Sequence, residues 1–154
     1  MAKITTTKAP SATKCAAKSV AAPKTTGISV TGNKKIETLS KEFTKAFPYL
    51  LLRVYYHCTK EKTAAGEAIP ASYMIEPSRT LGNARSANTS GGMTITGRMK
   101  ISSVEKEFQS VFGLHCQVCY WDASGNVLYT SGAQDAKTIS AFNAECEKNG
   151  CRKI

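Results

Sequence analysis

Two stretches of the chain have the same order of apolar and polar positions. Residues 28–56 and 93–121 align without a gap at an offset of 65 positions. In each stretch, a short apolar run ends at a Thr-Gly pair, apolar residues then recur at helical spacing, and a second apolar run follows. We interpret the two stretches as copies of one supersecondary unit that bury their apolar faces against each other. The identical pairs are Thr31/Thr96, Gly32/Gly97, Lys35/Lys100, Ile36/Ile101, Lys41/Lys106, Glu42/Glu107, Phe43/Phe108, Phe47/Phe112 and Tyr55/Tyr120.

The pattern within each copy predicts a β-α-β unit. Apolar residues such as Ile101, Val104 and Phe108 recur every three or four positions, which is the period of a helix with one buried face. Pro48 and Gly113 then end the two helices, because proline lacks a backbone donor and glycine tolerates a positive φ. The expected elements are strands 28–31, 49–57, 93–96 and 114–121 and helices 36–47 and 101–112.

Two β-α-β units in one chain predict an α+β fold with ferredoxin-like topology. A right-handed crossover leaves room between the two parallel strands of a unit, and the second unit fits into that room. The expected product is a split β-α-β two-layer sandwich, in which four antiparallel strands carry two helices on one face. Ser102 and Glu105 have the spacing of a capping box at the start of the second helix.

The two long strands disagree about which face is buried. Leu50, Leu52 and Val54 form one apolar face in the first copy, but Cys116 and Val118 of the second copy align with the opposite face. Because side chains alternate across a strand, the alignment leaves two alternatives. Either both strands are covered on both sides, or one copy has exchanged its inner face.

The rest of the chain completes the expected organisation. Residues 127–130 are expected to return as a hairpin strand, and residues 138–148 form a closing helix. The Thr80-Leu81 pair resembles the start of that helix, which suggests a trace of the same ending in the first copy. The expected divisions are a tail (1–27), a first repeat (28–57), a long irregular excursion (58–92) and a second repeat with hairpin strand and closing helix (93–154), with 28–154 forming one domain.

Half of the net charge lies at the N-terminus. The chain has a formal net charge of +10, and residues 1–27 hold five lysines and no acid. With two prolines and few large apolar groups, this tail is expected to be disordered. Spaced lysines on a flexible chain attract polyanions by counterion release, without reading a base sequence. The predicted polyanion-binding residues are Lys3, Lys8, Lys14, Lys18 and Lys24.

The sequence disfavours several classes of protein. The longest apolar run, residues 49–52, is far short of the ~20 residues of a membrane helix. The N-terminus also lacks the continuous apolar stretch of a secretory signal, so we expect a cytoplasmic protein with no membrane partner. The sequence has no Gly-rich phosphate loop, and neither histidine has a neighbouring acid. No catalytic residue and no cofactor are therefore predicted.

Six cysteines raise the questions of metal binding and disulfides. In Cys116-Gln-Val-Cys119, a spacing of three within a strand points the sulfurs to opposite faces, which disfavours a redox pair. A Cys146–Cys151 disulfide is expected only in an oxidising setting. Thiolates and imidazoles suit tetrahedral zinc, but the spacing fits no standard zinc module, so zinc is kept only as an alternative. The candidate ligands are Cys58, His115, Cys116, Cys146 and Cys151.

These observations favour a small non-enzymatic binding or structural protein. Its basic tail is expected to contact an acidic macromolecule, with nucleic acid or a ribonucleoprotein surface preferred. One alternative is a structural subunit of a larger assembly, such as a virion or a secretion apparatus. In that case the tail and residues 58–92 would order on docking to a protein partner, and exposed strand edges would accept further strands. A second alternative is a zinc- or thiol-dependent enzyme.

Overall fold

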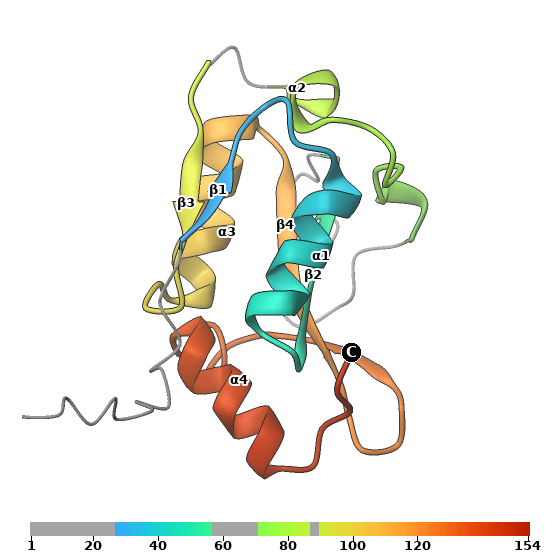
Figure 1. The fold of residues 1–154 in the computed structure, drawn as a ribbon, viewed down its shortest axis with the longest axis vertical. Coiled ribbons are helices and arrows are strands. Elements are labelled where there is room, and N and C mark those ends of the chain that lie inside the picture. The colour runs from blue at the N-terminus through green and yellow to red at the C-terminus, as the bar shows by residue number, and fades with distance from the viewer. Residues whose placement is uncertain (1–26, 57–70, 87–89) are drawn as a thin grey trace, which may run out of the picture.

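The computed structural model describes residues 27–56, 71–86 and 90–154. These residues form an α+β fold with four α-helices and two antiparallel sheets (Figure 1). Each predicted helix and strand is present, with ends that differ by no more than two residues from those expected. In chain order the elements are β1 (Ile28–Val30), α1 (Ile36–Ala46), β2 (Leu50–Tyr55), the 3-10 turn η2 (Ala71–Tyr73), α2 (Leu81–Ala84), β3 (Met93–Ile95), α3 (Ile101–Phe112), β4 (His115–Trp121), β5 (Val127–Tyr129) and α4 (Ile139–Lys148).

Strand pairing differs from that of a ferredoxin-like sheet. β1 pairs with β3, and β2 pairs with β4, which also pairs with β5; all of these pairs are antiparallel. In the expected arrangement, the two strands of one unit share a sheet and a strand of the other unit lies between them. Here β1 and β2 belong to different sheets, so the ferredoxin-like topology is not confirmed.

The edges of β2 give a physical reason for this difference. One edge pairs with β4 over the whole length of β2. On the other edge, the carbonyl oxygens of Leu50 and Leu52 accept hydrogen bonds from the hydroxyl groups of Thr44 and Ser40 in α1, each at 3.2 Å. These hydroxyls occupy acceptors that a neighbouring strand would need. Helix α1 therefore covers the edge at which another strand was expected.

The register between β2 and β4 decides which face is buried. Leu52 lies opposite Val118 and Val54 lies opposite Cys116, and none of these four side chains is more than 3% exposed. Because directly opposed residues of an antiparallel pair lie on the same face, these residues form one inner face. Relative to the gap-free alignment, the inner face is exchanged, as the second alternative states. The opposite face is also partly covered, because Tyr55 and Cys119 are fully buried there, so the first alternative holds in part.

The exchange of the buried strand face arises in the connections from α1 to β2 and from α3 to β4. Pro48 and Tyr49 precede Leu50, the first buried residue of β2, whereas Gly113 alone precedes the buried Leu114, which lies directly before β4. Gly113 has a φ of 64°, a left-handed conformation that allows the chain to turn within one residue. The second connection is one residue shorter, and a shift of one residue turns every side chain of a strand to the other face.

One hydrophobic core joins the two aligned stretches of the chain. Helix α1 packs on β2 and helix α3 packs on β4. The buried side chains of α1, α3 and α4 all belong to a single continuous cluster. They are Ile36, Leu39 and Phe43 from α1, Ile101, Val104, Phe108 and Phe112 from α3, and Ile139, Phe142 and Cys146 from α4.

The capping box expected at the start of α3 is not present. The helix begins after Lys100, whose side chain makes no capping hydrogen bond. Instead, the backbone N–H groups of Ile101 and Ser102 donate to backbone carbonyl oxygens of the segment before α4, at 3.1 and 3.0 Å. Because backbone acceptors already satisfy these donors, Glu105 is not needed as a cap, and its carboxyl group lies in the interior instead.

The irregular excursion predicted over residues 58–92 contains regular structure in its described part. The backbone N–H of Ile75 donates to the carbonyl oxygen of Val54 at 3.2 Å. In the second half of the chain, Thr130 makes the matching bond to Val118 at 3.0 Å, directly after β5. The excursion therefore returns alongside β2 much as β5 returns alongside β4.

Thr80 and Thr138 begin corresponding helices, as their sequence likeness suggested. Each hydroxyl oxygen accepts a hydrogen bond from the backbone N–H three residues later, at 3.3 Å. Each threonine also forms a β-bridge, Thr80 with Lys35 and Thr138 with Lys100, and these lysines are an identical pair in the alignment. Helices α2 and α4 are therefore anchored in the same way against α1 and α3.

Both aligned stretches also contain a close contact between a glycine and the first turn of the short helix α2 or of α4. Gly82 donates its backbone N–H to the carbonyl oxygen of Gly32 at 2.7 Å, and Ser140 donates to that of Gly97 at 2.9 Å. A Cβ atom added at Gly97 would lie 1.9 Å from Ser140 Oγ, whereas one added at Gly32 would meet nothing closer than 3.6 Å. An added side chain would therefore clash at Gly97 but not at Gly32.

Substituting Gly97 by alanine is expected to lower the free energy of unfolding by about 1–3 kcal/mol, the range typical of overpacking. Gly32→Ala, at the aligned position, should change it by less than ~0.5 kcal/mol. Urea unfolding followed by circular dichroism would measure both. The double substitution G97A/S140G copies the first half, where Gly82 takes the place of Ser140. It should be less destabilised than the sum of the single changes, and purely additive effects would contradict the steric explanation.

Candidate functional site

The predicted polyanion-binding lysines lie outside the described residues. Lys3, Lys8, Lys14, Lys18 and Lys24 all fall before Gly27, where the described part of the chain begins. The zinc candidate Cys58 and residues 58–70 of the excursion lie outside it as well. What the structure does describe is the surface next to Gly27.

Gly27 lines a cavity of about 870 Å³ between β1, α1 and α4. Ile28 and Phe47 contribute apolar surface to it, and Ser140 and Asn143 of α4 contribute polar groups. Gly97 and Ser140 are in close contact at the wall of this cavity, because a Cβ at Gly97 would lie 1.9 Å from Ser140 Oγ. The first described residue of the chain, Gly27, therefore lies at this cavity.

The charges around this cavity are mixed. Lys34 forms an ion pair with Glu42 at 2.5 Å and also donates to the carbonyl oxygen of Ser29. Lys45 and Glu147 line the same cavity and are exposed to solvent. The positive charge of Lys34 is thus neutralised locally, and the cavity does not concentrate one sign of charge.

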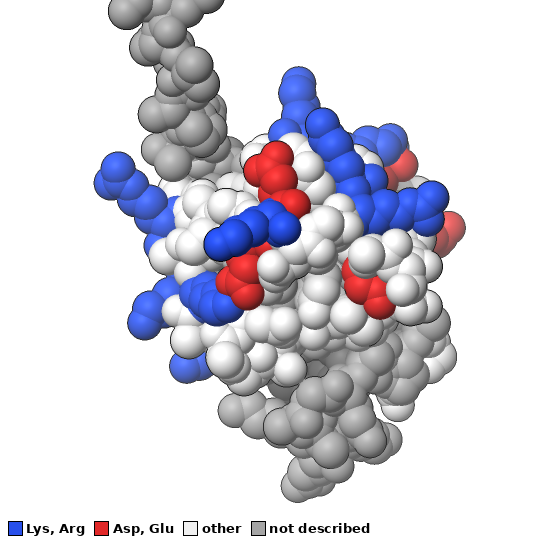
Figure 2. Space-filling model, turned by 90° about the horizontal axis from the view of Figure 1, so that it is seen from below, with Lys and Arg blue, Asp and Glu red and all other residues white. Residues whose placement is uncertain are grey.

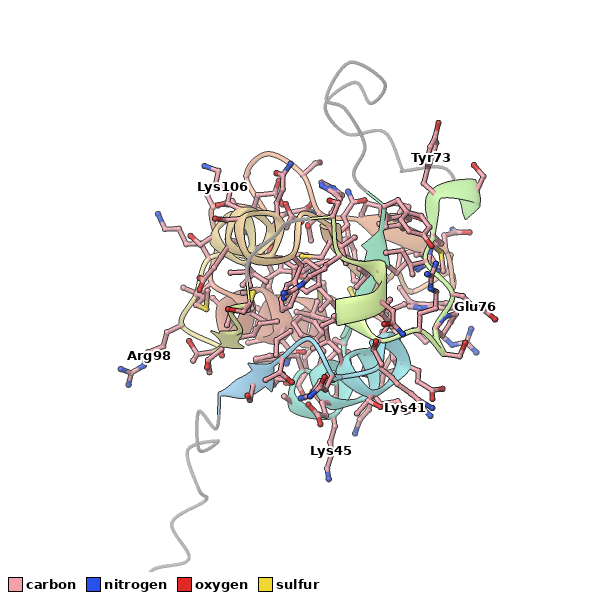
Figure 3. All side chains as sticks on the ribbon, turned by 90° about the horizontal axis from the view of Figure 1, so that it is seen from above. Lys41, Lys45, Tyr73, Glu76, Arg98 and Lys106 are labelled. Carbon is pink, nitrogen blue, oxygen red and sulfur yellow. The ribbon has the colours of Figure 1, made fainter. Side chains whose placement is uncertain are left out.

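The surface outside the cavity carries more basic than acidic side chains. The described residues hold fourteen Lys and Arg and nine Asp and Glu. Figure 3 shows Lys41, Lys45, Arg98 and Lys106 extending away from the body of the fold. Acidic side chains lie between basic ones in the view of Figure 2. The described residues alone therefore have a moderate positive field, and the dense block of uncompensated lysines is that of the tail sequence.

A second polar feature is a pair of partly buried carboxyl groups that the sequence did not reveal. Oε1 of Glu105 in α3 and Oδ1 of Asp135, in the segment before α4, are buried and have no hydrogen-bond partner. Burial, followed by the negative charge of Asp135, raises the pKa of Glu105 to about 8, although a hydrogen bond from the backbone N–H of Val118 opposes the shift. Glu105 is therefore mostly protonated at neutral pH. The one signal in the sequence is that the aligned position in the first copy is the small polar residue Ser40.

The outer face of the β2–β4–β5 sheet holds a third polar group of residues. Arg53 donates a hydrogen bond to the hydroxyl of Tyr129 at 2.9 Å, and its guanidinium lies 5.8 Å from the centre of that ring. Tyr55 and Cys119 on the same face are fully buried. Burial raises the pKa of Tyr55 and raises the pKa of Cys119 to about 12. Neither group can exchange a proton readily at neutral pH, which disfavours acid–base or thiolate chemistry there.

The described zinc candidates do not come together. His115 and Cys116 are consecutive strand residues, so their side chains point to opposite faces of β4, and Cys146 and Cys151 lie at the end of α4. Among the residues that the structure describes, no group of three or more His, Cys, Asp and Glu side chains is placed to hold a metal ion. Burial also raises the pKa of the Cys116 thiol well above its usual value, so it is not an activated nucleophile.

Comparisons with known proteins do not add a family or a function. No protein-family model, no curated protein and no solved structure matches the chain. Among the described residues, no helix has the length and apolar character needed to cross a membrane.

Proposed function

We propose that the protein is a small non-enzymatic binding protein whose lysine tail holds an acidic macromolecule, with nucleic acid or a ribonucleoprotein surface as the preferred partner. The observation that carries the proposal is the block of five lysines without an acid in residues 1–27. Such a block gives binding that depends on counterion release rather than on base reading.

The titratable side chains of the described residues support a non-enzymatic role. Its buried thiols and its buried tyrosine have raised pKa values, which do not suit nucleophilic or general-base roles near neutral pH. Its exposed lysines and arginines add a moderate positive field of the same sign as the tail. The folded part would then act as a scaffold that presents the tail, with Gly27 as the point of attachment.

The proposal is tested by the salt dependence of nucleic-acid binding. Fluorescence anisotropy with a labelled single-stranded RNA and a DNA duplex would compare the full chain with a variant in which all five tail lysines are glutamine. If the five lysines each neutralise a phosphate, the slope of log K against log salt should be less steep by about 3.5–4.5 in the variant.

A matched control removes the same charge from the folded part. Glutamine at Lys41, Lys45, Lys106, Lys148 and Lys153, which are all exposed, lowers the net charge equally but leaves the tail intact. We expect this control to keep most of the affinity and most of the salt slope. Equal losses in both variants would show that net charge alone matters, and unchanged binding in the tail variant would refute the role of the tail.

The assembly alternative is less well supported at β2. Strand addition needs unpaired backbone groups at a sheet edge, but the carbonyl oxygens of Leu50 and Leu52 already accept hydrogen bonds from α1. A strand added there would have to displace both hydroxyl groups. Light scattering that finds a strict monomer over a wide concentration range would count further against self-assembly.

A further inference from the structure

The end of α4 places two cysteines in a defined backbone motif. The helix ends at Lys148, and Gly150 follows in the left-handed conformation, with a φ of 71°. The backbone N–H of Cys151 donates to the carbonyl oxygen of Cys146 at 2.9 Å, and that of Gly150 donates to Glu147 at 3.2 Å. These are the two hydrogen bonds of a Schellman motif, in which the side chains of the two outer residues pack together. Here the two outer residues are Cys146 and Cys151.

The backbone bond limits how far apart these cysteines can lie. Standard bond lengths combined with the N···O distance of 2.9 Å allow the two Cα atoms to be separated by at most about 6.8 Å. Disulfides normally span Cα separations of roughly 4.4–6.8 Å. Cys151 also packs against the core cluster that contains Cys146. Burial, together with the charge of Cys151 and the hydrogen bond with it, raises the pKa of the Cys146 thiol to about 12.

The other described cysteines do not form such a pair. Cys116 and Cys119 are both fully buried, and their positions in β4 put them on opposite faces of the strand. Cys151 is partly exposed, whereas Cys146 is only 2% exposed. Within the described residues, an oxidant in solution therefore reaches Cys151 first, and Cys146 is the thiol next to it.

We propose that Cys146 and Cys151 are a redox modification site, in which a peroxide converts the two neighbouring thiols to a reversible disulfide. The Cys151 thiolate attacks one oxygen of hydrogen peroxide and becomes a sulfenic acid, while the other oxygen leaves and takes a proton to form water. Cys146 is mostly protonated because of its raised pKa, so its sulfur attacks the Cys151 sulfur as its proton is removed. The hydroxyl group of the sulfenic acid leaves with that proton as a second water. The two thiols lose two protons and two electrons in total, and one peroxide is reduced to two waters.

The disulfide would fix the C-terminal residues against the rest of the fold. The backbone N–H of Arg152 donates to the carbonyl oxygen of Trp121 at 3.0 Å, and Ile154 donates to that of Pro48 at 2.9 Å. Figure 1 shows the chain turning back after α4 towards α1 and β2, where the C-terminus lies. In the reduced protein, the end of α4 can fray and release these contacts, whereas the covalent bond holds the motif closed.

The position of Lys148 provides a direct test on the full chain. Trypsin cleaves after Lys148, so Cys146 falls in peptide 138–148 and Cys151 in peptide 149–152. After treatment with one equivalent of hydrogen peroxide and alkylation of the remaining thiols, we expect these two peptides to be recovered as one disulfide-linked species. Dithiothreitol should separate them again.

Single substitutions distinguish this site from general thiol oxidation. Cys151→Ser should abolish the linked species and leave Cys146 alkylatable after unfolding. Cys146→Ser should leave Cys151 as a sulfenic acid that a dimedone probe traps. The wild type should also gain about 3–8 °C in Tm on oxidation, and neither variant should. Recovery of Cys146 in its free form, or of Cys151 linked to Cys15 or Cys58, would overturn the proposal. Because the site does not involve the tail, neither outcome depends on nucleic-acid binding.

Discussion

Replacing Phe43 or Phe108 by alanine is expected to lower the free energy of unfolding by about 3–5 kcal/mol in each case. The two residues are an identical pair of the alignment, and both are fully buried. Each also packs against a second phenylalanine one turn later, with ring centroids 5.1 Å apart in α1 and 5.0 Å apart in α3. Removing either ring leaves a cavity in a core that both copies line.

The same pair of variants tests whether the two copies unfold together. Because their buried side chains form one cluster, we expect a single transition in urea that both substitutions shift by a similar amount. Trp121 fluorescence reports on β4, and circular dichroism at 222 nm reports on all helices. Lys45→Ala and Ser110→Ala, at aligned exposed positions of the same two helices, should stay within about 0.5 kcal/mol of the wild type. Two separate transitions, each sensitive to only one of the phenylalanine variants, would show that the copies are independent bodies.

Raising the pH should destabilise the protein through Glu105. Its pKa is about 8 in the folded protein, against a usual value of 4.5, mainly because of burial. Between these two values the folded state keeps a proton that the unfolded state has lost, so the free energy of unfolding falls as the pH rises through this window. The stability that is fully present below pH ~4.5 is lost progressively as the pH rises to the folded-state pKa, and the total loss is at most about 5 kcal/mol. Above pH ~8 the carboxylate is charged in the folded state as well as in the unfolded state, so this contribution to the pH dependence ends.

Glu105→Gln isolates this contribution. The amide has nearly the same shape, can still accept a hydrogen bond from the Val118 N–H and does not titrate. The variant should match the wild type near pH 5 and exceed it by a few kcal/mol near pH 9, as measured by urea unfolding at several pH values. Glu107→Gln, on the exposed side of α3, should follow the wild type throughout. A wild-type stability that stays constant or rises between pH 6 and pH 9, relative to the Glu105→Gln variant, would contradict the assignment.

The organisation of the helices was predictable because it depends on neighbouring residues. Apolar residues at helical spacing locate α1 and α3, and Gly113 marks the end of α3 because only a left-handed residue allows so short a turn. The start of α3 was not predictable in the same way. Its first N–H groups are satisfied by backbone carbonyl oxygens more than thirty residues later, and no local pattern encodes such a contact. For this reason Ser102 and Glu105 were misread as a capping box.

The candidate sites also differ in how far the sequence alone predicts them. The lysine tail is a property of composition, so the sequence alone suffices to propose it. The buried carboxyl pair is not, because Glu105 and Asp135 are thirty positions apart and only the packing of the segment before α4 against α3 brings them together. The cysteine pair lies between these cases. The sequence places Cys146 and Cys151 at the end of one helix, but the backbone motif that holds them together is visible only in the structure.

The sequence by itself determined that the chain contains two similar strand–helix–strand units, where their helices end, and that the positive charge is concentrated in the first residues. These properties follow from periodicity and composition over a few turns of chain. Only the tertiary structure decided which strands pair and which strand faces are buried. The pairing depends on the hydroxyl groups of α1, which bond to one edge of β2. The buried face of β4 depends on the connection between α3 and β4, which is one residue shorter than the connection between α1 and β2. A pattern of apolar residues permits several such pairings, and the packing of the whole core selects one of them.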